Sequence, residues 1–247
     1  MKSTLKLLFA AALLVAGQLL GADVTLTSGY MNRYMGFSSG NKLSDKATLQ
    51  SDAHVAFGSG VYVDLWDSTP LNSFDSKGKD FRKEIDYGVG YVCTVRGFGV
   101  NVGETYFDEP SLGAFGASDV WYTHAKLSHE LTLSPFGLEP ITVFGQYENY
   151  KTMPGTGYEG GSLFSLGANA NRAYRNVSVN VTQAFTYDDG GFGSNERLLA
   201  KMVIGVTWKV SEHFSLIAPQ VFGYLPITDT QQHDPEAMVY IAGQYQF

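Results

Sequence analysis

The chain has 247 residues, of which 28 are glycine, 14% are aromatic, 17% are charged and one is cysteine. These numbers exclude a disulfide-stapled miniprotein, a collagen-like repeat and a disordered tail, because those classes need many cysteines, glycine at every third position, or few apolar residues with much charge. The charged fraction lies below the roughly 25% of ordinary soluble domains, and the mean hydropathy is −0.08.

Residues 1–22 have the pattern of a secretory signal peptide. Two lysines precede an apolar run at 7–16, and small residues follow up to Ala22. The apolar run is shorter than the roughly 20 residues of a transmembrane helix. Removal of this segment takes away two of the 17 basic residues and none of the 24 acidic ones, which leaves a net charge of −9. Nucleic acid is therefore not an expected partner, and Cys93 has no second cysteine with which to form an intrachain disulfide.

Alternation with a period of two residues runs through most of residues 23–247, the expected mature domain. In 84–96 the odd positions are apolar, whereas the even positions carry acids, glycines and other mostly polar residues. Residues 176–187 and 198–210 repeat the pattern. Runs of about eleven such residues are longer than the usual five or six of globular sheets, and they match the roughly 9 to 11 residues of a tilted membrane-spanning strand.

The alternating segments predict about twelve strands, in chain order at 23–30, 47–57, 61–68, 84–96, 98–107, 118–132, 139–150, 161–170, 174–187, 197–210, 213–224 and 236–247. Long connections are expected at 31–46, 69–83, 108–117, 151–160, 188–196 and 225–235. Short turns are expected at 58–60, 97, 134–137, 171–173 and 211–212. An even strand number with long loops on one side and tight turns on the other predicts an all-β, transmembrane, antiparallel up-and-down β-barrel with both chain ends in the periplasm.

A soluble sandwich or lipocalin-like barrel would show the same alternation. Three features favour the membrane barrel instead: the strands are long, their polar faces are rich in glycine and hydroxyl groups, and the last strand ends in an aromatic residue. This strand, 238–247, ends in Phe247 with Tyr245 two residues before it, which resembles the insertion signal of bacterial outer-membrane proteins. The resemblance implies an outer-membrane location, with outer-membrane lipid and the barrel assembly machinery as partners.

If the apolar faces meet lipid, the polar faces line the lumen, which is the interior of the barrel. The ionisable residues expected there are Asp52, His54, Asp64, Glu84, Asp86, Arg96, His124, Lys126, Glu130, Glu148, Lys201 and Lys209. This mixture of charges predicts a weakly selective polar channel or an interior partly closed by ion pairs. The aromatic residues expected on the lipid face are Tyr30, Tyr91, Trp121, Tyr147, Tyr187, Trp208 and Tyr245.

Two places break the alternation. Glu104 shares a phase with Val100 and Val102, which would turn a carboxylate toward lipid, so a bulge near Gly103 or a position near the aqueous rim is expected. Pro219 lacks a hydrogen-bond donor, so a gap or bulge in its strand is expected.

Motifs of common enzymes are absent from the sequence, since there is no Gly-x-Ser-x-Gly elbow, no His-Glu-x-x-His helix, no phosphate-binding loop and no cysteine pair for zinc. No cofactor is expected. One alternative is a phospholipase-like barrel hydrolase with a serine, a histidine and an acid or amide, for which His129 beside Ser128 is the best histidine. Another alternative is a non-conducting structural or surface-binding barrel. Cys93 is interpreted as a small apolar residue.

Glycines and aromatic residues recur in a characteristic order over residues 24–110: Ser28-Gly29-Tyr30, Asn32-Arg33-Tyr34-Met35-Gly36-Phe37, Gly60-Val61-Tyr62, Trp66 with Ser68, Glu84-Ile85-Asp86-Tyr87, Gly90-Tyr91, Gly103, and Tyr106-Phe107 ahead of Pro110. In these features the chain resembles the TorF-like porin family of Gram-negative bacteria. It differs at Arg33, which is followed by Tyr34 where the family has an Arg-Gly pair. The resemblance implies an outer-membrane barrel and passive transport of small polar solutes, and it names no particular solute.

Overall fold

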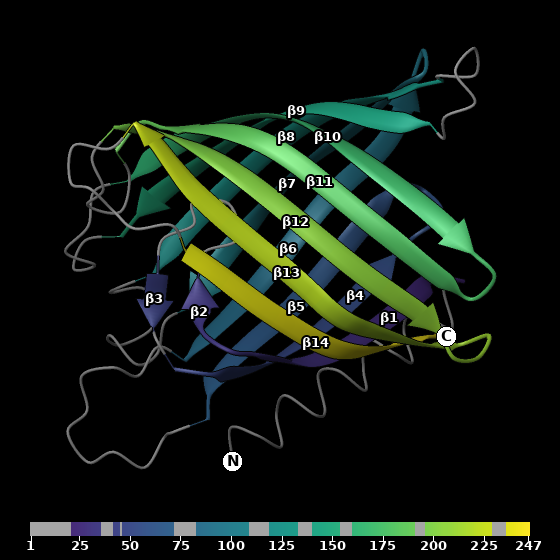
Figure 1. Ribbon diagram of the computed structural model, residues 1–247. Coiled ribbons are helices and arrows are strands. Elements are labelled where there is room, and N and C mark those ends of the chain that lie inside the picture. The colour runs from purple at the N-terminus through teal and green to yellow at the C-terminus, as the bar shows by residue number, and fades with distance from the viewer. Residues whose placement is uncertain are drawn as a thin grey trace.

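Twelve antiparallel strands close into a single barrel in the computed structural model (Figure 1), which describes residues 21–35, 42–44, 46–71, 83–108, 119–132, 140–153, 160–190, 196–228 and 236–247. The barrel strands are β1 (Asp23–Met31), β4 (Thr48–Ala56), β5 (Val61–Pro70), β6 (Glu84–Val95), β7 (Phe98–Asp108), β8 (Val120–Leu131), β9 (Ile141–Thr152), β10 (Gly161–Tyr174), β11 (Val177–Asp188), β12 (Arg197–Lys209), β13 (Phe214–Thr228) and β14 (Glu236–Gln246). Each strand pairs with its neighbour in sequence, so the predicted all-β, up-and-down barrel is confirmed.

The barrel closes where the first strand meets the last. β1 pairs with β14 over Thr25↔Gln246 to Met31↔Tyr240, and with β4 on its other side. Two further short strands, β2 (Tyr34–Met35) and β3 (Lys42–Ser44), form a separate two-stranded sheet. Within the described residues there is no helix of the length and apolar character needed to cross a membrane.

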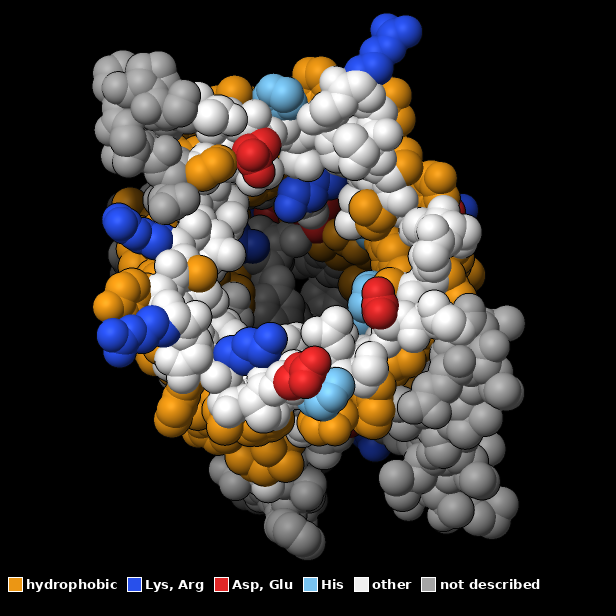
Figure 2. Space-filling view, turned by 90° about the vertical axis from the view of Figure 1, so that its right-hand side faces the viewer, with side chains coloured by type: hydrophobic (Ala, Val, Ile, Leu, Met, Phe, Trp, Pro, Cys, Tyr) orange, Lys and Arg blue, Asp and Glu red, His pale blue; other side chains and the backbone are white. Residues whose placement is uncertain are grey.

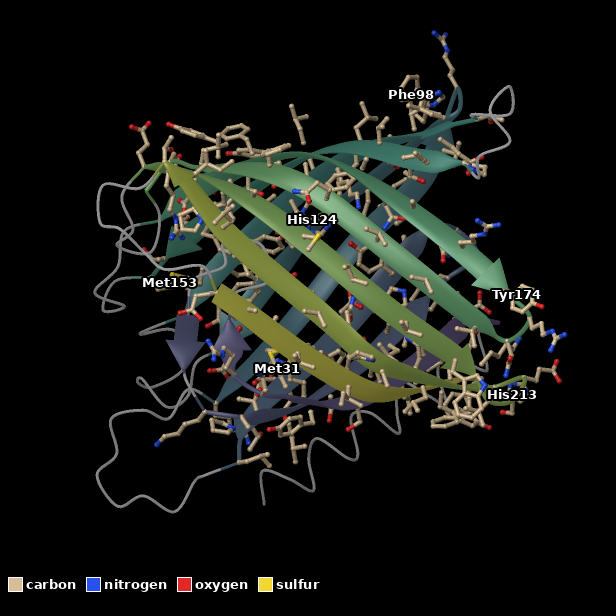
Figure 3. All side chains as sticks on the ribbon, viewed as in Figure 1. Met31, Phe98, His124, Met153, Tyr174 and His213 are labelled. Atoms are coloured by element: carbon tan, nitrogen blue, oxygen red, sulfur yellow. The ribbon has the colours of Figure 1, made fainter. Side chains whose placement is uncertain are left out.

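The two ends of the barrel differ in their connections. The turns at 57–60, 96–97, 175–176 and 211–213 lie at one end, which we call the short-turn rim. In Figure 3 this end carries the labelled Phe98, Tyr174 and His213, whereas Met153 lies at the opposite end, the long-connection rim. Between β6 and β7 the chain turns in two residues, with a φ of 51° at Arg96 and 83° at Gly97. Positive φ at both central residues is typical of the two-residue hairpin turn that matches strand twist.

Strand boundaries follow the alternation closely, with two corrections. The turn expected at 171–173 is wrong, because β10 continues to Tyr174 and the chain turns at 175–176. Asn171 is paired with Asn180, so the asparagine that suggested a turn belongs to the polar face of the strand. The connection expected at 225–235 begins later, because β13 continues to Thr228. The turn predicted at 134–137 and residues 1–20 of the predicted signal peptide lie outside the described residues.

The apolar phase of the strands faces outward. On β11 the five apolar side chains Val177, Val179, Val181, Phe185 and Tyr187 are 37% to 52% exposed, whereas Ala184, Thr186 and Asp188 of the other phase are at most 3% exposed. The seven aromatic residues expected on the lipid face are all exposed. Viewed onto the short-turn rim, Figure 2 shows hydrophobic side chains around the outside and charged side chains around a central opening. This arrangement is the one that a bilayer requires of a barrel, and it places the protein in the outer membrane.

The two irregular places have different outcomes. Of the two explanations expected for Glu104, the bulge near Gly103 is wrong, because the pairing of β7 with β6 and with β8 is continuous through that residue. The other explanation, a position near the aqueous rim, stays a prediction. Glu104 is exposed on the outer face beside Val102. The glycine is needed for space instead: a Cβ on Gly103 would lie 2.7 Å from Cε1 of His124. At Pro219 the expected irregularity is confirmed, since the pairing of β13 with β14 shifts between Ile217 and Gln220.

Candidate functional site

Contacts that skip a strand identify the inner face of the barrel. The hydroxyl of Tyr62, on β5, reaches Asn101 on β7 and His124 on β8, past the intervening strand β6. Side chains diverge on the convex outer face of a barrel and converge on its concave inner face, so these three side chains point inward. The strand registers then place the rest of the polar phase on the same face as Tyr62.

Tyr62, Asn101 and His124 form a compact hydrogen-bonded triangle. The Tyr62 hydroxyl donates to Oδ1 of Asn101 at 2.9 Å and lies 3.2 Å from Nε2 of His124, which in turn lies 3.1 Å from the same Oδ1. Tyr62 is 8% exposed. The other ring nitrogen of His124, Nδ1, is buried and has no hydrogen-bond partner among the residues that the structure describes. The triangle therefore contains one polar atom whose hydrogen-bonding capacity is unused.

Glycines form the floor under this triangle. A Cβ on Gly90 would lie 2.2 Å from Cζ of Tyr62, and a Cβ on Gly103 would lie 3.0 Å from the Tyr62 hydroxyl. Gly88 is next on the same face, where a Cβ would lie 3.2 Å from Cβ of Asp64. Contacts under 3.0 Å are not tolerated, so only glycine lets the tyrosine ring lie flat across β6. The glycines on the polar face of 84–96 thus have a packing role.

An ion pair adjoins the triangle. Nδ1 of His54 donates to Oδ1 of Asp64 at 2.6 Å, and the two side chains remain 37% and 32% exposed. The His54 ring lies 5.4 Å from the Tyr62 ring, centroid to centroid. These five residues border a cavity of about 630 Å³ near the 57–60 turn, whose lining residues are His54, Ala56, Phe57, Gly58, Gly60, Tyr62, Asp64, Val92, Asn101 and His124.

A second inward group surrounds Glu148 on β9. This carboxylate is 1% exposed and accepts a 2.5 Å hydrogen bond from the Tyr122 hydroxyl. The Tyr122 ring lies 4.9 Å from Tyr150, 5.6 Å from Phe107 and 5.5 Å from His124. A continuous series of aromatic rings and imidazoles therefore runs along the inner wall from β9 to β4.

Cations on the inner wall lie over aromatic rings. Nζ of Lys126 is 4.4 Å from the centroid of the Phe144 ring, and Nζ of Lys201 is 5.9 Å from that of Tyr224. Both distances are within the range of a cation–π attraction. The inner wall thus combines charges of both signs with aromatic surface.

Ion pairs stabilise the long-connection rim. Nε of Arg197 lies 3.2 Å from Oδ2 of Asp188, with both side chains at most 4% exposed, and Nη1 of Arg33 lies 2.5 Å from Oε2 of Glu236. These four residues are not among those predicted from the sequence, because the pattern assigns them to strand ends or loops. Tyr62, Asn101 and Tyr122 are not among them either, since the predicted set contains only charged residues and histidines. Their position in the polar phase of the alternation is the signal that could have identified them.

The registers place eleven of the twelve predicted lumen residues in the inward phase of a strand; these are Asp52, His54, Asp64, Glu84, Asp86, His124, Lys126, Glu130, Glu148, Lys201 and Lys209. Arg96 differs, because it lies in the exposed turn after β6 instead of on the strand. Among them, a direct hydrogen bond joins His54 to Asp64. His124 and Glu148 face each other on paired strands.

The residues considered for hydrolysis have other contacts. Nδ1 of His129 donates to the carbonyl oxygen of Gly97 at 3.0 Å, and its ring lies 4.7 Å from that of Phe98. Ser128 points to the opposite face and donates to the carbonyl of Gly99. His129 therefore caps the turn at the short-turn rim. The described residues contain no group of three or more side chains arranged to hold a metal ion.

Comparisons with known proteins show the fold. No family model matches the chain, and no curated protein does. Among solved structures, the KdgM porin in complex with disordered oligogalacturonate is similar at 9% identity, a TM-score of 0.54, and coverage of 92% of this chain and 99% of that one. The NanC porin is similar at 8% identity, with a TM-score of 0.56 and coverage of 91% of this chain and 100% of that one.

The fold is that of the outer-membrane porins.

A third similar structure is an outer membrane channel from Pseudomonas putida F1, with 8% identity, a TM-score of 0.51, and coverage of 92% of this chain and 95% of that one. Because these likenesses span nearly the whole of each chain, the porin fold covers the entire barrel. At such low identity they indicate the architecture and leave the solute open.

Proposed function

We propose that the protein is a porin-like channel through which small polar solutes diffuse passively across the outer membrane. One observation carries the proposal: a closed barrel with an apolar exterior surrounds a polar, charged interior that opens at the short-turn rim (Figure 2). On this proposal the lumen is lined by the eleven predicted residues that lie in the inward phase, whereas Arg96 lies in the turn at the rim. The motifs of residues 24–110 support membership of the TorF-like porin family.

The charge of the inner phase supports a modest preference for cations. The carboxylates of this phase in the described strands are Asp23, Asp52, Asp64, Glu84, Asp86, Glu130, Glu148, Asp188 and Glu236, and the basic residues are Lys126, Arg197, Lys201 and Lys209. Nine acids against four bases give a negative interior, even with some of them paired. Fields inside a narrow low-dielectric passage act strongly on permeating ions.

Planar-bilayer recording of the refolded protein tests the proposal. We expect discrete conductance steps in KCl and, under a KCl gradient, a reversal potential of the sign that K⁺ permeation gives. The double variant Asp64→Asn/Asp86→Asn is expected to move the reversal potential toward zero. Glu104→Gln is the matched control, because it also removes negative charge but on the outer face, and it should leave selectivity unchanged. A folded barrel that passes no current contradicts the channel and favours a structural or surface-binding barrel.

The observations do not favour the hydrolase alternative, since His129 caps a turn and Ser128 points to the other face. If lipid or ester hydrolysis were nevertheless measured and were lost in His129→Ala, the proposal would have to be revised.

We further propose that the C-terminal strand, ending in Phe247, is the segment that the barrel assembly machinery recognises. Phe247 and Tyr245 are both exposed on the outer face, and their rings lie 4.7 Å apart.

A further inference from the structure

The cavity beside the 57–60 turn has the properties of a built binding site. It measures about 630 Å³, a volume within the range of small-molecule pockets. Its polar groups come from four different strands, β4, β5, β7 and β8, and they converge on one space: His54, Asp64, Tyr62, Asn101 and His124. A few converging polar groups on an otherwise apolar and glycine wall are typical of sites that fix the orientation of a solute.

The polar groups are held in place before any solute arrives. Tyr62 is fixed by its bonds to Asn101 and His124 and by the glycine floor of Gly90 and Gly103. Asp64 is fixed by His54. Because these side chains are already held in place, the binding of a solute loses less side-chain entropy. These side chains are therefore arranged to bind a solute and do more than fill the interior of the barrel.

The groups match a solute that carries many hydroxyls. The Asp64 carboxylate accepts hydrogen bonds. Oδ1 of Asn101 already accepts from Tyr62 and His124, so the Asn101 amide offers its NH2 group as a donor. The His54 ring, on a side chain that is 37% exposed, adds apolar surface of the kind that a sugar ring covers.

The charged side chains of the cavity restrict further the class of solute that it can bind. The lining residues that the structure describes include no lysine or arginine, so within this lining His54 alone offsets the charge of Asp64 toward an anionic solute. The negative charge of Asp64 is shared with His54 at 2.6 Å, which weakens its attraction for a free cation. Both side chains stay about one-third exposed, so a solute in the lumen can reach them.

We propose that this cavity is a binding subsite for a small uncharged polyhydroxylated solute, of the size of a hexose or a hexitol, near the short-turn mouth of the lumen. The inference rests on the proposed channel function, which it makes more specific. A solute would bind there before leaving or after entering at this rim.

Binding can be measured without any current. Saturation-transfer NMR on the refolded protein in micelles would use glucose and sorbitol as probes, with glucuronate and lysine as charged comparisons. We expect saturable binding of the uncharged probes, weakened roughly tenfold by Asp64→Asn and also by Asn101→Leu, since each removes hydrogen bonds to the solute. Tyr30→Phe, on the outer face, is the matched control and should bind like the wild type. The heat-dependent mobility of the barrel on gels would confirm that each variant is folded.

The outcomes separate the two proposals. Glucose binding in a barrel that passes no current supports the subsite and overturns the channel. Conductance without glucose or sorbitol binding overturns the subsite alone. Tighter binding of glucuronate or lysine than of glucose overturns the uncharged class, and equal glucose binding by wild type and both folded variants overturns the location.

Discussion

Replacement of Gly90 by alanine tests the idea that the glycine floor positions Tyr62. The new Cβ would lie 2.2 Å from Cζ, 2.3 Å from the hydroxyl oxygen and 2.6 Å from Cε1 of Tyr62, so the ring has to move away from β6. Movement of the ring breaks its contacts with Asn101 at 2.9 Å and His124 at 3.2 Å. Gly223→Ala is the matched control, since the nearest atom to its new Cβ is the carbonyl oxygen of Met202 at 3.8 Å.

The expected magnitude follows from these contacts. Two lost hydrogen bonds at about 0.5 to 1.5 kcal/mol each give about 1 to 3 kcal/mol, and overpacking of a filled site costs a similar amount when the site adjusts by strain instead. Alanine in a strand regains about 0.5 to 1 kcal/mol relative to glycine. Gly90→Ala should therefore lower the free energy of unfolding by about 1 to 2 kcal/mol, whereas Gly223→Ala should leave it unchanged or raise it slightly.

Urea unfolding of the barrel refolded into lipid vesicles, followed by tryptophan fluorescence, measures both variants. A second measurement makes the assignment specific: Gly90→Ala combined with Tyr62→Ala should cost less than the sum of the two single changes, because the clash needs the ring. If Gly90→Ala is as stable as Gly223→Ala, or if the two effects are additive, the reasoning about Tyr62 is refuted.

Three further predictions concern charged residues. Arg197→Met should destabilise the barrel by about 3 kcal/mol in the same assay, because it leaves the buried Asp188 without this partner. Arg197→Met combined with Asp188→Leu should recover most of the lost stability. If Arg197→Met alone has no effect, the ion pair does not stabilise the barrel in this way. Glu104→Leu should stabilise the barrel in vesicles by about 1 kcal/mol, because the carboxylate lies on the outer face. A loss of stability would show instead that Glu104 has a favourable partner there. Asp64→Asn should reduce the K⁺ preference measured by reversal potential more than Glu130→Gln does, since Glu130 is exposed close to the rim; equal effects would contradict a role of the interior charges.

The fold could be predicted in detail because the bilayer imposes a simple rule on the sequence. Lipid on one side and water on the other require alternation over the whole length of each strand, so segments such as 84–96 and 176–187 are visible without any structure. The failures occurred where one residue type serves two purposes. Asn171 suggested a turn although it is an inward residue, and Gly103 suggested a bulge although it makes room for His124.

The candidate site was only partly predictable for a related reason. Alternation assigns a residue to a face but does not give the register between strands, and the register decides which inward residues meet. Asp64 and His124 were expected on the inner face, yet nothing in the sequence places Tyr62 between them. That contact needs β5, β6 and β7 to align so that Gly90 and Gly103 lie side by side beneath the ring.

The pairing of β1 with β14 also sets the order of events in assembly. Contacts along this seam join residues more than 200 positions apart, as between Asn32 and Val239 or between Thr27 and Gln244. Until β14 has been synthesised, β1 and β13 each have an edge of backbone groups without partners, and lipid cannot satisfy them. The chain can therefore complete its barrel in lipid only once its last strand is available to close the seam.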